Sequence, residues 1–200
     1  AGHEMIVYNR SAAAAVSLES RGAKVAATPE AVLAAEIVIS MLADDAAVDA
    51  VWVASGLAAR MPSSGIHLNM ATVSLAMGKR LAVLHRDAGS GYVSAPVFGR
   101  PYAAAKGRLD IVVAGESGAI ERCNPVFAAL AQAMETHATA AGFATILCNT
   151  AGSAMREVDY VQMLLERRVD GMLFICAEVT DVRSDHSHYR QLLERGARLV

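Results

Sequence analysis

Short apolar runs alternate along the chain with longer stretches in which apolar residues recur every three or four positions. The short runs predict β-strands, and the longer stretches predict amphipathic α-helices. A continuous run such as Ile37–Leu42 is typical of a strand that is covered on both faces, as in a parallel sheet between helices. The pattern therefore predicts an α/β fold. The expected strands cover residues 5–8, 37–42, 66–70, 92–95, 109–114, 144–148 and 171–176.

Capping residues and proline mark the expected helix ends. Ser11 and Asp44 each precede a helical stretch, where a side-chain oxygen can accept a hydrogen bond from an N–H group of the first turn. Asn124-Pro125 interrupts the stretch 117–141. Because proline suits the first turn of a helix, we expect a new helix to begin there. Later helices are expected over residues 154–168 and 184–195.

Composition argues against several classes of protein. Hydrophobic residues make up 54% of the chain and charged residues 19%, as in a globular protein. Residues 1–123 carry 11 Lys and Arg against 11 Asp and Glu, and residues 124–200 carry 7 against 9. Neither part has the basic excess that nucleic-acid binding needs. We find no membrane-span or signal-peptide pattern, and the three dispersed cysteines favour a reducing, cytoplasmic location.

The tripeptide Asn9-Arg10-Ser11 follows the first predicted strand. In a dinucleotide-binding domain, this position contacts the ribose of the adenosine. An acidic residue there binds the 2′-hydroxyl group of NAD, whereas an arginine accommodates the 2′-phosphate of NADP. Alternatively, Asn9 and Ser11 only cap the next helix and Arg10 is solvated. Taken alone, the tripeptide leaves both interpretations open.

Four segments favour the first interpretation by their order along the chain: residues 1–11, 39–48, 67–74 and 92–101. Together they resemble the cofactor domain of the β-hydroxyacid dehydrogenases, the family of 3-hydroxyisobutyrate dehydrogenase and 6-phosphogluconate dehydrogenase. The resemblance covers residues 1 to about 123. It implies the NADP-binding Rossmann domain of an enzyme that oxidises a 3-hydroxy acid or reduces the matching semialdehyde.

The resemblance also implies roles for single positions along the cofactor. One group would contact the 2′-phosphate, a second would line the cofactor beyond the third strand, and one residue would lie near the nicotinamide. These cofactor-binding positions are Asn9, Arg10 and Ser11, then Met41 and Leu42, and finally Thr72.

The expected substrate loop departs from the family pattern. Phe98-Gly99-Arg100 replaces the usual Ser-Gly-Gly, and Ala71 replaces a serine that usually contacts the substrate. Arg100 either binds a substrate carboxylate in place of these groups or is an ordinary surface arginine. The substrate-binding positions that the resemblance implies are Pro96, Val97, Gly99 and Arg100.

Two further family features do not occur in the sequence. No GxGxxG is present, although this turn and the following helix N-terminus hold the pyrophosphate in a Rossmann domain. The family's general acid/base is a lysine on a helix beyond the cofactor domain, and this chain has no lysine after Lys106. We therefore assign no catalytic residue. We expect weak or lost NADP binding and no activity of the chain as it stands.

Residues 124–200 resemble a different family. The segments 124–127, 140–143, 147–150 and 164–174 are similar to the effector-binding domain of LacI-type regulators, in its N-terminal lobe. This resemblance implies sugar-binding roles for Phe127, Ala177 and Glu178, although Phe127 could equally be ordinary helix core. Neither a helix-turn-helix nor a second lobe is present. The tract Asp185–His188 contains ligand-type residues, but their spacing is poor for a metal, and we assign none.

The sequence thus predicts a Rossmann-like parallel sheet with helices on both faces, continued by a partial periplasmic-binding-protein-like lobe. We divide it into residues 1–123, a partial dinucleotide-binding domain, and 124–200, a partial LacI-type sugar-binding lobe. The favoured function is the cofactor domain of an NADP-dependent dehydrogenase. The alternatives are a sugar-binding module and a chimeric or designed α/β protein without a ligand. Unpaired strand edges would join the two parts into one sheet or pair between chains in a homodimer.

Overall fold

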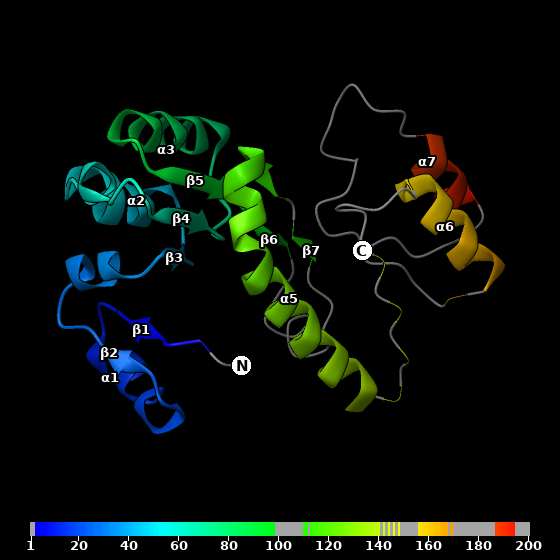
Figure 1. Ribbon diagram of the computed structural model, residues 1–200, viewed down its shortest axis with the longest axis horizontal. Coiled ribbons are helices and arrows are strands. Elements are labelled where there is room, and N and C mark those ends of the chain that lie inside the picture. The colour runs from blue at the N-terminus through cyan, green and yellow to red at the C-terminus, as the bar shows by residue number, and fades with distance from the viewer. Residues whose placement is uncertain are drawn as a thin grey trace. The chain divides into compact units, whose positions relative to one another are not determined.

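A computed structural model describes residues 3–98, 110–111, 113–140, 142, 144, 146, 148, 156–167, 169 and 187–194. The chain forms two compact units. The first contains residues 1–96 and 115–125, and the second contains residues 97–114 and 126–200. Figure 1 shows the elements along the chain. Each unit is described separately below.

The first unit begins with a small parallel sheet. Strand β1 (Ile6–Val7) pairs with β2 (Lys24–Val25). The N–H groups of Lys24 and Ala26 donate to the carbonyl oxygens of Met5 and Val7, each at 2.8 Å. The crossover consists of α1 (Ala12–Val16) and the 3-10 helix η1 (Glu19–Arg21). This crossover ends at Gly22, whose φ of +90° favours glycine.

A second sheet contains four strands in the order β3-β4-β5-β8. The 3-10 helix η2 (Pro29–Ala34) leads into it from β2, so a helix begins at Thr28-Pro29. The first three strands are parallel and in register, with Ser40 opposite Asn69 and Asn69 opposite Ser94. These strands are β3 (Ile37–Ser40), β4 (Ile66–Asn69), β5 (Gly91–Ser94) and β8 (Ala114–Gly115).

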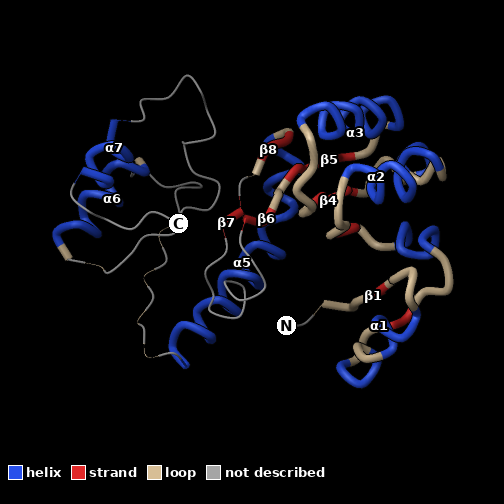
Figure 2. The backbone as a smooth tube through the Cα atoms, turned by 180° about the vertical axis from the view of Figure 1, so that it is seen from behind, coloured by secondary structure: helices blue, strands red, loops and turns tan. Residues whose placement is uncertain are grey.

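Helices cover both faces of this four-stranded sheet, as predicted (Figure 2). One face packs against α2 (Asp45–Val48), its π-helical continuation η3 (Asp49–Ala54), the 3-10 helix η4 (Ala58–Arg60) and α3 (Leu75–Ala88). On the other face, Gly91 lies beside Ile66 and beside Ala119 of α5 (Ser117–Ala140). The buried core of the first face comprises Val38, Val48, Trp52, Leu57, Ala58, Met61, Ala71, Met77 and Leu81.

The helices cover strand β3 only partly, whereas the run 37–42 predicted a strand that is covered on both faces. The Ile39 side chain is 44% exposed, although its neighbours Val38 and Ser40 are buried. Ile39 points to the face on which α5 lies against β5, two strands away. Among the described residues, β3 pairs with β4 alone and β1 with β2 alone. Each of these two strands therefore has one edge without a described partner.

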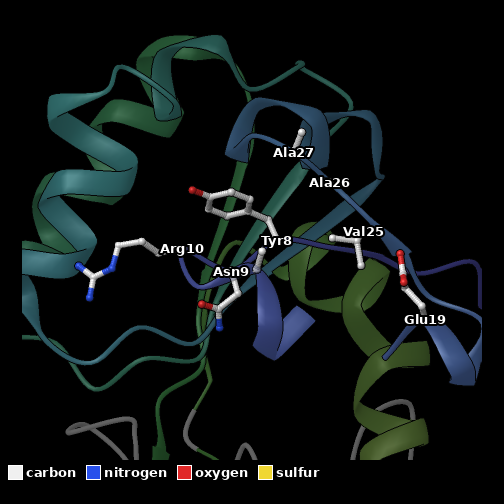
Figure 3. Close-up of a pocket in the computed structure, with 8 residues that line it drawn as sticks. Tyr8, Asn9, Arg10, Glu19, Val25, Ala26 and Ala27 are labelled. Atoms are coloured by element: carbon white, nitrogen blue, oxygen red, sulfur yellow. The ribbon is translucent and has the colours of Figure 1, made fainter. Parts of the chain in front are cut away.

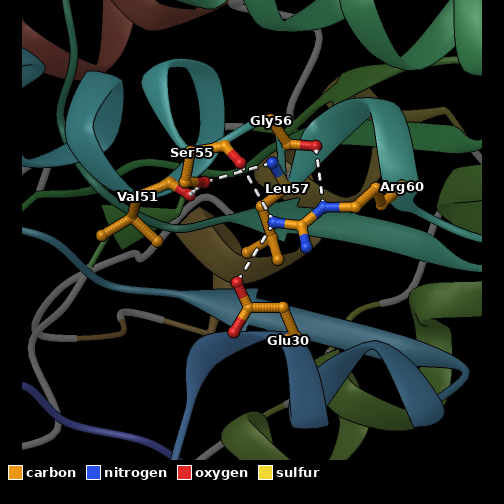
Figure 4. Close-up of polar contacts among 6 residues, drawn as sticks. All are labelled: Glu30, Val51, Ser55, Gly56, Leu57 and Arg60. Carbon is orange, nitrogen blue, oxygen red and sulfur yellow. Dashed lines mark hydrogen bonds and ion pairs between the residues drawn. The ribbon is translucent and has the colours of Figure 1, made fainter.

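One polar cluster connects η2 to the turn between η3 and η4 (Figure 4). The Arg60 guanidinium donates to the carbonyl oxygens of Ser55 at 3.0 Å and Gly56 at 3.4 Å. The same group pairs with Glu30 at 3.1 Å. Because both charged side chains are exposed, the pair orients these segments more than it stabilises them.

In the described part of the second unit, β6 (Val97–Phe98) pairs antiparallel with β7 (Asp110–Ile111). After the part of α5 that belongs to this unit come α6 (Glu157–Glu166) and α7 (Ser187–Glu194), near the expected positions. Val161 and Leu192 form a small buried cluster. Of the predicted strand 144–148, residues 144, 146 and 148 are described and none is in a strand. The predicted strand 171–176 lies outside the described residues.

The expected helix start at Asn124-Pro125 is wrong. Helix α5 is continuous from Ser117 to Ala140, with Pro125 inside it. Proline removes one backbone hydrogen bond, which costs about 3 kcal/mol in a helix interior. The alanine-rich sequence that follows supplies strong helix formers that offset this loss. The two units divide at Pro125. Within the described residues, no helix is both long and apolar enough to cross a membrane.

Candidate functional site

A pocket of about 350 Å³ lies at the carboxyl ends of β1 and β2. This volume is at the lower end of the roughly 300–1,000 Å³ that is usual for ligand pockets. Two of the three residues predicted to contact a 2′-phosphate, Asn9 and Arg10, line it. The remaining lining residues are Tyr8, Ala12, Glu19, Val25, Ala26 and Ala27.

Local hydrogen bonding fixes the backbone at the rim of this pocket. The Asn9 Oδ1 atom accepts a hydrogen bond from the Ser11 N–H at 2.9 Å, which closes a tight turn after β1. Ser11 stands at the N-cap of α1, but its side chain makes no capping bond there. Ser11 is therefore part of this turn, but it is not among the residues that line the pocket.

The two charged groups of the pocket lie apart. Figure 3 shows the Arg10 guanidinium on one side and the Glu19 carboxylate on the opposite side, with the Tyr8 ring between them. Arg10 is exposed and forms no ion pair with the residues that the structure describes. A guanidinium presents five N–H donors in a planar fork that suits carboxylate and phosphate oxygens. The Arg10 side of the pocket is therefore suited to an anion.

The other predicted cofactor residues follow two adjacent strands of the four-stranded sheet. Met41 comes directly after β3, and its side chain is 61% exposed. Leu42 is half-buried and packs against the core of the helical face. Thr72 is exposed in the loop after β4, whereas Ala71 before it is buried. Because Ser40 and Asn69 are in register, the loops that carry Met41 and Thr72 leave neighbouring strand ends.

Hydrogen bonds from Ser74 tie the start of α3 to the start of α2. The Ser74 N–H donates to the Asp45 carboxylate at 2.8 Å, and the Ser74 hydroxyl donates to the same group. These two bonds lower the pKa of Asp45. Asp44 caps α2 as predicted, because its Oδ1 atom accepts from the Ala47 N–H at 2.8 Å.

The remaining predicted positions are only partly described. Pro96 and Val97 are half-buried, and Val97 lies in β6. Phe127 is half-buried on α5. The other positions, Gly99, Arg100, Ala177 and Glu178, lie outside the described residues. Among the residues that are described, no three His, Cys, Asp or Glu side chains gather as metal ligands do.

Sequence reasoning missed a buried polar group beneath the β4 loop. His67, Asn69 and His85 are fully buried, and the Trp52 ring stacks on His67 with centroids 3.5 Å apart. Burial lowers the pKa of both histidines, that of His85 to about 4. A signal for His85 was present in the sequence, because it follows the buried residues Met77 and Leu81 at intervals of four along α3.

Comparisons with known proteins agree with the fold. A family profile described as the NAD binding domain of 6-phosphogluconate dehydrogenase matches residues 1–143. An uncharacterized oxidoreductase of Bacillus subtilis, YfjR, is 41% identical over 134 residues, which cover 66% of this chain and 47% of that protein. The structure of Mycobacterium tuberculosis 3-hydroxyisobutyrate dehydrogenase is 25% identical with a TM-score of 0.57. The match covers 66% of this chain and 44% of that one.

The later part of the chain is similar to other proteins. A transcriptional repressor of Photobacterium profundum, PurR, is 43% identical over 56 residues, which cover 28% of this chain and 17% of the repressor. Such repressors match the part that resembles LacI-type regulators. The chain spans about half the length of the dehydrogenase-like proteins it matches and a smaller share of the repressor.

Proposed function

Because the chain belongs to the family of the NAD binding domain of 6-phosphogluconate dehydrogenase, we propose that its β1–β2 pocket binds the adenosine 2′-phosphate end of NADP. The observation that carries this proposal is that Asn9 and Arg10 both line this pocket. Arg10 has no described anionic partner there, so a bound phosphate would supply one. NAD lacks this phosphate and would leave the guanidinium without a counter-charge.

The residues present fit one end of the cofactor better than its middle. A pyrophosphate is usually held by a glycine-rich turn and the helix N-terminus after it, and the sequence contains no GxGxxG. Met41 and Leu42 would line the cofactor beyond β3, and Thr72 would lie near the nicotinamide. We therefore propose weak binding, in about the millimolar range, where RT ln Kd corresponds to only about 4 kcal/mol.

We propose that the ancestry of residues 1–123 is that of an NADP-dependent 3-hydroxyacid dehydrogenase and that residues 124–200 are a separate partial lobe. In that ancestry Pro96, Val97, Gly99 and Arg100 belong to the substrate loop. Bound NADP supplies a hydride acceptor, but a lysine that could move the hydroxyl proton does not follow Lys106 in this chain. The chain as it stands is therefore expected to show no NADP-linked turnover of 3-hydroxy acids.

Isothermal calorimetry with NADPH and NADH tests the binding proposal. We expect NADPH to bind at least tenfold more tightly than NADH, and Arg10→Asp to abolish the preference because it replaces the cation with an anion. Arg21→Asp is a matched control, since Arg21 is also exposed but does not line the pocket. Equal or tighter binding of NADH by the parent protein would overturn the proposal.

A second candidate function is a sugar-binding module of the LacI type. The observation that favours it is the PurR similarity in the later part of the chain. Phe127, Ala177 and Glu178 would contact the ligand in that case. A rise in the midpoint of thermal unfolding with a sugar, but not with NADPH, would select this function, because a ligand of the folded state stabilises it.

Location and partners follow from the same observations. The three dispersed cysteines favour a reducing environment, and we propose a cytoplasmic location. With a net charge of −2 and balanced halves, we propose that the chain does not bind nucleic acid by itself. The edges of β1 and β3 that lack a described partner offer unpaired backbone groups for homodimerisation. Sedimentation over a hundredfold range of concentration tests this, and a monomer throughout would contradict it.

A further inference from the structure

Four side chains form a continuous hydrogen-bonded path along the face of the four-stranded sheet that packs against α3. His85 Nδ1 lies 2.9 Å from Ser90 Oγ, and His85 Nε2 lies 2.9 Å from His67 Nδ1. The His67 Nε2 atom lies 2.7 Å from Ser40 Oγ. All four residues are buried. The path therefore connects the end of α3 to β4 and then to β3 through buried side chains.

Starting from the Ser40–Asn69 hydrogen bond, the hydrogens along this path can be assigned in one direction. The Ser40 hydroxyl donates to Asn69 Oδ1 at 3.1 Å, so its oxygen is left to accept from His67 Nε2–H. A neutral imidazole carries a single N–H, and hence His67 Nδ1 accepts from His85 Nε2–H. The Ser90 Oγ atom lies 2.9 Å from His85 Nδ1 and 3.4 Å from the His85 carbonyl oxygen. In this assignment the Ser90 hydroxyl donates to the nearer acceptor, His85 Nδ1.

Burial explains why both histidines remain neutral. Desolvation is the main cause that lowers the pKa of His67 and of His85, and the proximity of His85 lowers that of His67 further. The rings are enclosed by Trp52, stacked on His67, and by Tyr92, stacked on His85. With one N–H on each ring, every hydrogen along the path has one acceptor, so the set is fully satisfied.

The path ends at the loop after β4. The Asn69 Oδ1 atom that accepts from Ser40 also accepts from the Ala71 N–H at 3.3 Å. The Asn69 Nδ2 group donates to the Tyr92 hydroxyl at 3.4 Å. These contacts hold the carboxamide from both sides, so its oxygen faces the backbone that leads from Ala71 to Thr72.

We propose that Ser40, His67 and His85 are positioning residues, which orient the Asn69 carboxamide and thereby fix the backbone of Ala71 and Thr72. The use of this loop by the nicotinamide half of NADP rests on the proposed function. None of the three side chains needs to touch the cofactor. Because all of these side chains are uncharged, they fix the loop without placing a buried charge next to the strand ends where the cofactor would bind.

Two serine substitutions at opposite ends of the path provide the test. Ser40→Ala removes the link to Asn69, whereas Ser90→Ala removes only the first donor and leaves the later links intact. Both delete one buried hydroxyl. We expect the Ala71 amide, followed by NMR hydrogen exchange in the protein without cofactor, to exchange at least tenfold faster in Ser40→Ala. In Ser90→Ala the rate is expected to stay within threefold of the parent.

The amide of Leu68, at the centre of β4, serves as an internal reference and should change equally in the two variants. No acceleration at Ala71 in Ser40→Ala, or the same acceleration in both variants, would overturn the proposal. Cofactor binding is measured separately, as the ratio of the NADPH affinity to that of adenosine 2′,5′-bisphosphate. Ser40→Ala is expected to lower this ratio about tenfold. If the parent binds neither compound, the proposed function fails, and the exchange rates still decide the positioning role.

Discussion

The two sheets of the first unit differ in how far each is removed from water. Every residue of β4 is buried, and the helices on one face enclose a continuous core. No residue of β1 or β2 is buried, and the turn between β1 and α1 presents Asn9 and Arg10 to solvent. The comparison separates two tasks, because packing and buried polar order lie in the four-stranded sheet, while the side chains that we propose bind the 2′-phosphate follow strand β1 of the two-stranded sheet.

The largest expected effect is the pH dependence that the buried histidines impose. The pKa values of His67 and His85 in the folded state lie below 6.5, so the unfolded state binds protons first as the pH falls. Their stabilisation is complete above pH 6.5 and is lost below it. The free energy of unfolding should fall by up to about 1.4 kcal/mol per pH unit for each histidine.

Urea denaturation at pH values from 7.5 to 4.5 measures this slope. Above pH 4.5 the loss is ascribed to the histidines, because Glu4, Glu30, Asp45 and Asp159 have lowered pKa values and lose their stabilising charge only at lower pH. A flat profile between pH 6.5 and 4.5 would show that His67 and His85 are protonated in the folded protein.

A pair of leucine truncations compares the packing of the two regions. Leu81 is fully buried in the core of the four-stranded sheet, and Leu18 is half-buried after α1. We expect Leu81→Ala to lower the free energy of unfolding by about 3 kcal/mol and Leu18→Ala by about 1 kcal/mol. The midpoints of urea denaturation at constant slope give both values. Similar losses would mean that the two regions are equally well packed.

The smallest expected effect concerns the helix caps, of which the one beside the four-stranded sheet is better formed than the one beside the two-stranded sheet. Asp44 accepts a hydrogen bond at the start of α2, whereas the Ser11 side chain makes no such bond at the start of α1. Asp44→Ala should therefore cost about 1 kcal/mol, and Ser11→Ala less than about 0.5 kcal/mol. Thermal and urea unfolding of the two variants measure these losses. A larger loss of unfolding free energy in Ser11→Ala than in Asp44→Ala would contradict the prediction.

Local pattern predicted the α/β fold and several of its details. The strands at 5–8, 37–42, 66–70 and 92–95 and the Asp44 cap are confirmed, because each depends on a few consecutive residues. The pattern also led to Asn9 and Arg10, which line the pocket. The prediction at Asn124-Pro125 is wrong, because the local preference of proline for a first turn yields to the helical sequence around it.

Features that depend on distant residues were not predictable. The continuous run 37–42 gave no sign that Ile39 would be exposed, since that depends on which helix covers that part of the sheet. The contact of His67 with His85 requires the register of β4 and the path of α3 across it. The spacing of His85 along α3 indicates burial, but nothing in the sequence shows that His85 and His67 meet.

The most direct test of the central claim is an NMR titration of the isotopically labelled protein with adenosine 2′,5′-bisphosphate. This compound carries the 2′-phosphate without the nicotinamide half. We predict that the amide signals of Asn9, Arg10, Ala26 and Ala27 shift most, that Ala71 and Thr72 stay unchanged, and that Arg10→Asp removes the shifts. Shifts confined to other residues, or none at millimolar concentration, would contradict the assignment of the pocket to the adenosine 2′-phosphate.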